Sequence, residues 1–190
     1  MKHSIFFITF ITVCFLLFSC GKSDEQANAR QNVSVQVADN VTKVQSSKDE
    51  NGWYHNWDEG ITAAVKEKKP VLVDFYTDWC TWCKVMDDST FSNSEIKKIL
   101  TSEWITIKID AEDKKTSGTF KDRTMPYNRL VLAFGVRGYP SYLFIDKEGE
   151  PITVISGYHP KEQFKPMLDY FINELYKKDV NLMKYIESNS

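Results

Sequence analysis

The sequence predicts an α/β domain in which a central mixed sheet is flanked by helices on both faces. Short apolar runs rich in β-branched residues alternate with segments of helical spacing, and the last two runs are joined by a tight turn. Strands separated by helices tend to pair in parallel, whereas the strands of a hairpin are antiparallel. Since both arrangements are expected here, the sheet should be mixed.

The first half of the domain contains two strands and three helical segments. A helix is expected from Trp57 to about residue 69, because apolar residues recur there at helical spacing and Pro70 follows. Residues 71–76 form an apolar run that is typical of a buried strand. Helices should follow over 80–88 and, from a capping box at 92–95, through Leu100. Alternation over 104–109 predicts a second strand that ends at Asp110.

The second half begins with a polar stretch, 111–123, which we expect to be a loop. A helix should cover 128–134 and close at Gly135. Strands are expected over 141–145 and 152–155, joined by a hairpin turn at 146–149. A final helix over 164–175 completes the order αβααβαββα.

Composition and charge restrict the class of protein. Hydrophobic residues make up 42% of the 190 residues and aromatic residues 14%, so the chain can build a core and is not wholly disordered. The formal net charge of −2 offers no basic field, so we expect no nucleic-acid partner.

Residues 1–19 have the pattern of an export signal. A weakly basic start precedes an apolar stretch, 5–18, which is shorter than the roughly 20 residues of a spanning helix. The sequence Leu17-Phe18-Ser19-Cys20 resembles the lipobox of bacterial lipoproteins, which implies that Cys20 carries lipid and becomes the N-terminus. An uncleaved anchor and ordinary signal cleavage are the alternatives.

The rest of the chain divides by composition. Residues 20–52 lack aromatic residues and are rich in polar ones, which predicts a lipidated cysteine followed by a flexible tether. The folded domain should then cover 53–178, with a C-terminal tail over 179–190.

Two cysteines, Cys80 and Cys83, carry the predicted chemistry. They are three positions apart, directly after a buried strand and at the start of a helix, so one helical turn brings their sulfurs within reach of a disulfide. The helix N-terminus favours the thiolate of Cys80 and lowers its pKa. Cys83 should be more buried and able to attack a mixed disulfide on Cys80. This pattern predicts thiol–disulfide exchange, with Cys80 as nucleophile and Cys83 as the resolving thiol.

The cysteine pair has three alternative uses. Haem attachment requires a histidine after the second cysteine, where this chain has Lys84. Zinc or copper would need further ligands, and His55 and His159 lie at opposite ends of the domain, so no metal site is expected. An inert structural disulfide is the third alternative, although so short a loop constrains the unfolded chain little.

The segment 71–84, Val-Leu-Val-Asp-Phe-Tyr-Thr-Asp-Trp-Cys-x-x-Cys-Lys, resembles the active-site segment of thioredoxins. Its wider context is similar to the periplasmic C-terminal domain of the transmembrane thiol:disulfide interchange protein. The resemblance covers about residues 53–176 and implies a thioredoxin fold. It also implies that Pro140 is the family's cis-proline and that Tyr139 contributes backbone hydrogen bonds to bound substrate.

Asp74 lies in the middle of the apolar strand 71–76 and should therefore be buried, which raises the pKa of its carboxyl. It stands six residues before Cys80, where the thioredoxin family has an acid. The functional interpretation is a proton acceptor for Cys83, and the alternative is a hydrogen-bonded structural residue.

Several aromatic residues and lysines lie near the cysteine pair in the sequence. Trp79, Trp82, Tyr139 and Tyr158 are candidates for an apolar rim that binds substrate, and ordinary packing is the alternative. Lys84 and Lys108 are expected to be solvated charges rather than site residues. The dipeptide Thr81-Trp82 and the long segment 111–130 depart from thioredoxin, so redox direction and partner choice are open.

These observations predict a thiol:disulfide oxidoreductase that is lipid-anchored in the bacterial cell envelope and faces the periplasm. Its redox-active disulfide, Cys80–Cys83, would need no other cofactor. Expected partners are exported cysteine-containing proteins, a membrane electron-transfer protein, and the membrane through lipid on Cys20. The resemblance favours the reducing direction. The alternative is a lipid-anchored, non-catalytic or metal-carrying binding module that uses the same cleft.

Overall fold

The structure, a computed structural model, describes residues 47–190. The predictions of a signal segment over 1–19, of lipid on Cys20 and of a tether as far as residue 46 concern residues outside the described part of the chain. The last residues assigned to the tether, 47–52, are ordered against the domain, where Lys48 forms a β-bridge with Tyr54. Within the described part of the chain, no helix is long and apolar enough to cross a membrane.

The central sheet has five strands in the order β1-β3-β2-β6-β7. β1, β3 and β2 run parallel, while β6 and β7 are antiparallel to their neighbours, so the sheet is mixed as predicted. A separate two-stranded sheet pairs β4 with β5. The strands are β1 (Trp53–Tyr54), β2 (Val71–Tyr76), β3 (Ile105–Asp110), β4 (Ser117–Phe120), β5 (Arg123–Pro126), β6 (Ser141–Ile145) and β7 (Pro151–Ser156).

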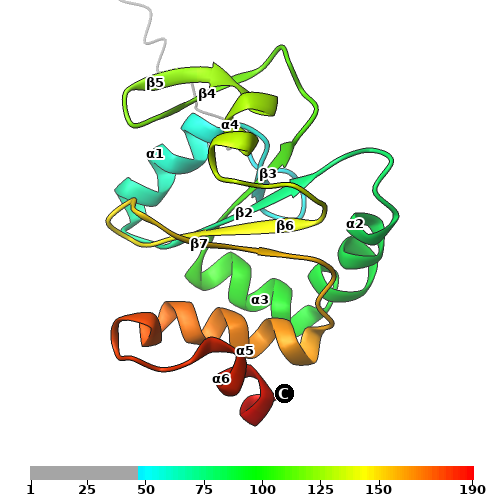
Figure 1. Cartoon of the computed structure of the whole chain (residues 1–190), viewed down its shortest axis with the longest axis vertical. Helices are drawn as coiled ribbons and strands as arrows, with labels where there is room; N and C mark the ends of the chain where they lie inside the picture. The colour runs from blue at the N-terminus through cyan, green and yellow to red at the C-terminus, as the bar shows by residue number, and fades with distance from the viewer. Residues whose placement is uncertain (1–46) are drawn as a thin grey trace, which may run out of the picture. The chain divides into compact units, whose positions relative to one another are not determined.

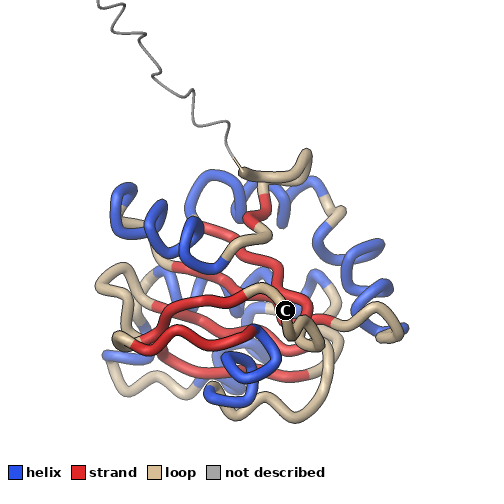
Figure 2. The backbone as a smooth tube through the Cα atoms, turned by 90° about the horizontal axis from the view of Figure 1, so that it is seen from above, coloured by secondary structure: helices blue, strands red, loops and turns tan. Residues whose placement is uncertain are grey.

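Helices cover both faces of the central sheet (Figure 1). One face carries α1 and α4 together with the β4–β5 hairpin, and the other carries α3, α5 and α6. Seen from above, the strands run side by side across the middle of the domain, with helical segments around and across them (Figure 2). The helices are α1 (Trp57–Glu67), α2 (Thr81–Met86), α3 (Ser94–Glu103), α4 (Tyr127–Ala133), α5 (Lys161–Ile172) and α6 (Leu182–Asn189), with a π-helical turn η1 (Asp87–Phe91) and a 3₁₀ turn η2 (Leu175–Lys177).

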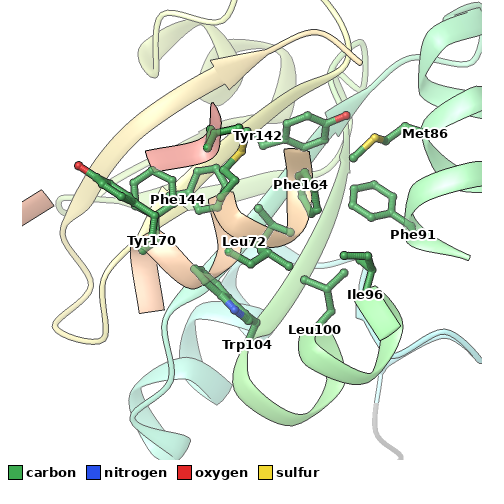
Figure 3. Packing of buried hydrophobic residues seen from close by; sticks show 14 of the residues in the cluster. Leu72, Met86, Phe91, Ile96, Leu100, Trp104, Tyr142, Phe144, Phe164 and Tyr170 are labelled. Carbon is green, nitrogen blue, oxygen red and sulfur yellow. The ribbon is translucent and has the colours of Figure 1, made fainter. Parts of the chain in front are cut away.

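The alternation of side chains along the strands creates two separate cores. On the α1 and α4 face, apolar residues of β2, β3 and β6 pack against Trp57 and Leu130. On the opposite face, Leu72 and Phe144 pack with residues of α3 and α5 (Figure 3). Each of these strands is thus buried on both sides, as the apolar run at 71–76 predicted.

Two of the predicted local features differ in the structure. Asn93, and not Ser92, caps α3, because its side-chain oxygen accepts hydrogen bonds from the backbone N–H groups of Glu95 and Ile96 at 3.1 and 3.3 Å. Ser92 follows η1 as its C-cap residue with αR backbone angles, and its hydroxyl donates to the carbonyl of Asp88. The chain therefore passes from α2 through η1 with only a short break before α3.

The segment expected to be a loop, 111–123, instead leads into the β4–β5 hairpin. This hairpin docks on α1, where the indole N–H of Trp57 donates to the carbonyl of Thr119 at 2.8 Å and Asp58 accepts from the backbone of Thr119 at 2.8 Å. Gly118 lies so close to Trp57 that a Cβ there would meet the ring at 2.8 Å. These contacts link positions about 60 residues apart, so the polar composition of the segment gave no local signal of them.

At the other end, the residues expected to form a C-terminal tail, 179–190, contain α6. Asn181 caps this helix by accepting from the backbone N–H of Lys184 at 3.1 Å. Ile186 is buried in the same core as α5. The domain core therefore continues through the last helix.

Candidate active site

Cys80 and Cys83 form a disulfide at the start of α2. Cys80 occupies the N-cap position, and its sulfur accepts a hydrogen bond from the backbone N–H of Cys83 at 3.0 Å. This position exposes the sulfur to the positive end of the helix dipole, which favours a thiolate when the disulfide is reduced. Both residues are 4% exposed, so in the oxidised state Cys83 is not the more buried of the two.

The Tyr139–Pro140 peptide bond is cis, as the resemblance to thioredoxins implied. Pro140 is buried immediately before β6, and Tyr139 is partly exposed. The ring of Tyr139 packs edge-to-face on Trp79 with centroids 6.0 Å apart. This contact places the loop before β6 beside the residue that precedes Cys80.

Two aromatic pairs include a tryptophan next to the cysteines, one just before Cys80 and one between Cys80 and Cys83. Trp79 and Trp82 are 64% and 58% exposed, which is unusual for tryptophan. Trp82 stacks on Tyr158 with centroids 5.4 Å apart, and the hydroxyl of Tyr158 lies 3.2 Å from that of Ser89. Each tryptophan is thus held by a tyrosine while much of its surface faces solvent.

Asp74 is buried in β2, as predicted, with 2% of its surface exposed. Burial raises the pKa of its carboxyl to about 6, although the ammonium of Lys108 acts in the opposite direction. One oxygen, Oδ2, lies 3.3 Å from Lys108 Nζ, while Oδ1 has no hydrogen-bond partner among residues 47–190. A carboxyl with this pKa can exchange a proton near neutral pH.

The expectation for Lys108 was wrong. Its side chain is only 15% exposed and forms ion pairs with both Asp74 and Asp87. Burial by itself lowers the pKa of Lys108, but the two carboxylates raise it above its usual value, so the ammonium stays charged. Its Nζ also lies 5.3 to 5.9 Å from the rings of Trp53, Tyr76 and Phe91. Lys84, in contrast, is exposed as expected.

The structure also brings in Asp87, which the sequence did not single out. It begins the π-helical turn η1, and its side chain reaches from that turn to Lys108 on β3. A pocket of about 300 Å³ opens beside this ion pair and is also lined by Trp53 and Phe91. Asp87 and Lys108 both line this pocket, so their ion pair is accessible to solvent from it.

A signal for Lys108 was present in the sequence. It alternates with Ile105, Ile107 and Ile109, which pack on the α1 and α4 face, so its own side chain must point to the other face. Asp74 alternates with Val73 and Phe75 in the same way. The missing information was that β2 and β3 are neighbours with Asp74 opposite Lys108.

Comparisons with known proteins agree with this geometry. The thioredoxin-like domain family matches residues 57–172. Thiol:disulfide interchange protein DsbD of Ralstonia nicotianae is 31% identical over 109 residues, and that of Yersinia pestis is 28% identical over 141 residues. These matches cover 56% and 73% of this chain, but only 16% and 20% of the relatives' length.

Among solved structures, a thioredoxin-fold protein from Helicobacter pylori is similar, with a TM-score of 0.56 and 16% sequence identity. The match covers 76% of this chain and 92% of that protein, and it supports the fold. The family match, which spans more than half of the chain, shows that this chain belongs to the thioredoxin-like domain family.

Proposed function

We propose that this chain is a cell-envelope thiol:disulfide oxidoreductase that reduces disulfides in exported proteins. The observation that carries the proposal is the Cys80–Cys83 disulfide at the N-terminus of α2, which follows the strand β2 that holds the buried carboxyl of Asp74. A second support is the similarity to the interchange proteins, of which this chain spans about a fifth or less.

The exchange starts from the reduced pair. The Cys80 thiolate attacks one sulfur of a substrate disulfide, forms a mixed disulfide and releases the other substrate sulfur as a thiolate. Cys83 then loses its proton to Asp74, and its thiolate attacks the Cys80 sulfur. This second attack closes the Cys80–Cys83 disulfide and releases the remaining substrate thiolate. Two electrons have then passed to the substrate, and the two released thiolates take up protons.

The roles of the remaining site residues follow from their positions. Trp79 and Trp82 offer exposed aromatic surface beside the disulfide, and an apolar segment around a substrate cysteine would be desolvated there. Tyr139 packs on Trp79, and Tyr139 and the adjoining Pro140 would hold the substrate backbone. The cysteine pair carries the electrons, so the proposed reaction uses no further cofactor.

Continued reduction requires a source of electrons outside the cytoplasm. We infer that a membrane electron-transfer protein re-reduces the Cys80–Cys83 disulfide by the same exchange chemistry. Lipid on Cys20 would hold the domain at the membrane, facing the periplasm, within reach of that donor. This inference draws on the sequence around Cys20 and on the similarity to the interchange proteins.

The exchange is tested with three cysteine variants of the full chain in a dithiothreitol-coupled assay of insulin disulfide reduction. Cys80→Ser should abolish activity, and Cys83→Ser should accumulate a mixed disulfide that is visible on a non-reducing gel. Cys20→Ser is the matched control, which should keep the exchange activity while leaving the membrane fraction. Retention of activity in Cys80→Ser would overturn the catalytic assignment.

The direction is tested by the reduction potential in glutathione buffers. Potentials in this class range from about −270 mV for thioredoxin to about −120 mV for a strong oxidant. A value near the lower end supports a reductase, whereas a value near the upper end contradicts the proposed direction and leaves the exchange chemistry intact. Stoichiometric metal bound through the two thiols would instead indicate a metal-carrying module.

A further inference from the structure

Ser141, the first residue of β6, is a polar residue at the end of an apolar face of the sheet. It lies opposite Phe75 of β2 and alternates with Leu143 and Ile145, all of which pack on the α1 and α4 face. Its side chain is fully buried. Burial of a hydroxyl costs free energy unless the hydroxyl is hydrogen-bonded, so the partners of Ser141 explain what a serine does at this position.

The hydroxyl of Ser141 has two partners, one in the loop before β6 and one on the neighbouring strand. It donates to the backbone carbonyl of Gly138 at 2.7 Å, and it lies 2.7 Å from the hydroxyl of Ser156 on β7. A serine hydroxyl carries a single hydrogen, and that of Ser141 is used in the bond to Gly138. Ser156 is therefore the donor in the second contact, and the hydrogen bonds run from Ser156 through Ser141 to Gly138.

The loop 138–140 is attached to the sheet at both ends. At one end, the N–H of Gly157, which follows β7, donates to the carbonyl of Pro140 at 2.8 Å. At the other end, the attachment of Gly138 is the bond from the Ser141 side chain. The orientation of the peptide group after Gly138 therefore depends on a hydroxyl, and removing that hydroxyl would release it.

The bond to Gly138 also sets the direction of the next N–H group. The Gly138–Tyr139 peptide is trans, and in a planar trans peptide the C=O and the N–H point to opposite sides. Because the carbonyl of Gly138 points to the buried Ser141, the N–H of Tyr139 points away from it. This N–H donates to no backbone carbonyl within residues 47–190. Gly138 itself is exposed, and a Cβ there would meet nothing within 4 Å.

The N–H of Tyr139 lies in the loop beside the reactive cysteine. The ring of Tyr139 packs on Trp79, which immediately precedes Cys80. A disulfide that exchanges with Cys80 brings the chain around the substrate cysteine next to this loop. The backbone carbonyls of that chain are strong hydrogen-bond acceptors, so they match an N–H that is directed away from the sheet.

We propose that Ser141 is a positioning residue for substrate binding, whose hydroxyl holds the Gly138 carbonyl inward so that the N–H of Tyr139 faces the backbone of a peptide substrate. The inference rests on the proposed function, in which Tyr139 holds the substrate backbone. Ser156 strengthens the arrangement, because hydrogen bonds in a chain polarise one another. The favoured substrate class is a disulfide carried by a peptide chain, since a small disulfide without peptide groups offers no backbone carbonyl.

The test compares two substrates in Ser141→Ala, which removes the hydroxyl and keeps the β-carbon. One is the disulfide-linked dimer of an acetylated and amidated Ala-Cys-Ala peptide, and the other is bis(2-hydroxyethyl) disulfide. The ratio of the two second-order rate constants, peptide over small disulfide, should fall about three- to tenfold, as expected for the loss of one neutral hydrogen bond. Ser156→Ala should lower the ratio by less than about twofold.

Two further variants separate the hydroxyl from its effect on packing. Ser141→Thr keeps the hydroxyl and should keep the ratio. Thr106→Val is the matched control, because Thr106 is also buried and its hydroxyl donates to the carbonyl of a glycine, Gly52, at 3.1 Å. It should lose stability without a change in the ratio. The proposal is overturned if Ser141→Ala leaves the ratio unchanged, or if Ser141→Thr or Thr106→Val lowers it as much.

Hydrogen exchange of the Tyr139 amide, measured by NMR, reports on the proposed contact directly. In Cys83→Ser, the mixed disulfide with the same peptide should slow this exchange, and the additional change Ser141→Ala should reduce the protection about three- to tenfold. Equal protection in both variants contradicts the proposal. If the unmodified chain reduces neither disulfide, the proposed function fails together with this inference. If it reduces both and the ratio does not depend on Ser141, the inference alone fails.

Discussion

The two faces of the central sheet are built from the same strands and yet differ in chemistry. On the face covered by α1 and α4, the strands contribute Val, Ile, Leu and Phe, and the buried groups are almost entirely apolar. On the opposite face, the same strands place Lys108, Asp74 and Tyr142 in a row among aromatic side chains. Because side chains alternate along a strand, one residue of difference in position decides which face a group joins.

The two faces therefore contribute differently, one to the stability of the fold and the other to its capacity for proton exchange. Burial of the apolar side chains on the α1 and α4 face stabilises the folded state, and no electrostatic cost offsets this stabilisation. The opposite face holds a carboxyl whose pKa burial raises, together with buried polar atoms that lack partners in the described chain. Such groups cost stability and retain the capacity to exchange protons. The apolar core on the α1 and α4 face therefore stabilises the domain, while the opposite face holds the buried groups that can exchange protons.

The largest expected effect is on the rate of exchange and comes from Asp74, on the face covered by α3 and α5. Asp74→Asn should slow release of the second substrate thiol by about 10²- to 10³-fold, because a positioned proton acceptor contributes on that order. Formation of the mixed disulfide, which needs only the Cys80 thiolate, should change little. Rapid quenching of the mixed disulfide separates the two steps.

Asp88→Ala serves as the control for this variant, since Asp88 is an exposed acid on the same helical segment as Asp87. Both steps should proceed normally in it. Equal slowing of both steps in Asp74→Asn would argue that the carboxyl supports the structure of the site rather than the proton transfer.

The converse effect is expected on the apolar face. Leu130 of α4 is fully buried there, and Leu130→Ala should lower the free energy of unfolding by about 2–5 kcal/mol. The rate of disulfide exchange per folded molecule should not change. Chemical denaturation and the insulin assay measure the two quantities. Leu132→Ala on the same helix is the control, because Leu132 is 57% exposed and its loss should change stability by less than about 0.5 kcal/mol.

A smaller effect concerns the pH dependence of stability. The pKa of Asp74 is raised by burial from 3.8 to about 6, so the folded chain binds a proton more tightly than the unfolded chain does. Asp74 should therefore lower the stability of the folded state as the pH rises from about 4 to about 6, by at most about 3 kcal/mol. Asp74→Asn should abolish this dependence.

Denaturation of both forms between pH 4 and pH 8 measures this effect. The gain in stability from Asp74→Asn should be present at pH 7 and should disappear as the pH falls below about 4. A gain that is the same at every pH would show that the substitution acts through packing and not through the charge of the carboxyl.

Local patterns in the sequence were sufficient for much of the fold. The run at 71–76, the alternation at 104–109 and the hairpin near residue 146 each specify an element, because they depend only on neighbouring residues. The N-cap of α3 is Asn93, one residue after the predicted Ser92. Both residue types are good N-caps, and Ser92 is already used as the C-cap of the π-helical turn η1. The β4–β5 hairpin escaped prediction because its contacts with Trp57 are distant in sequence.

The sequence by itself determined the chemistry of this protein: two cysteines one helical turn apart at the start of a helix, and an acid inside a buried strand. Only the tertiary structure decided what surrounds that acid. In the sheet, β2 lies between β3 and β6. Lys108, which was expected in solvent, is therefore opposite Asp74 on one side, and Tyr142 is opposite Asp74 on the other. Strand order and register depend on packing between distant segments, which no local pattern encodes.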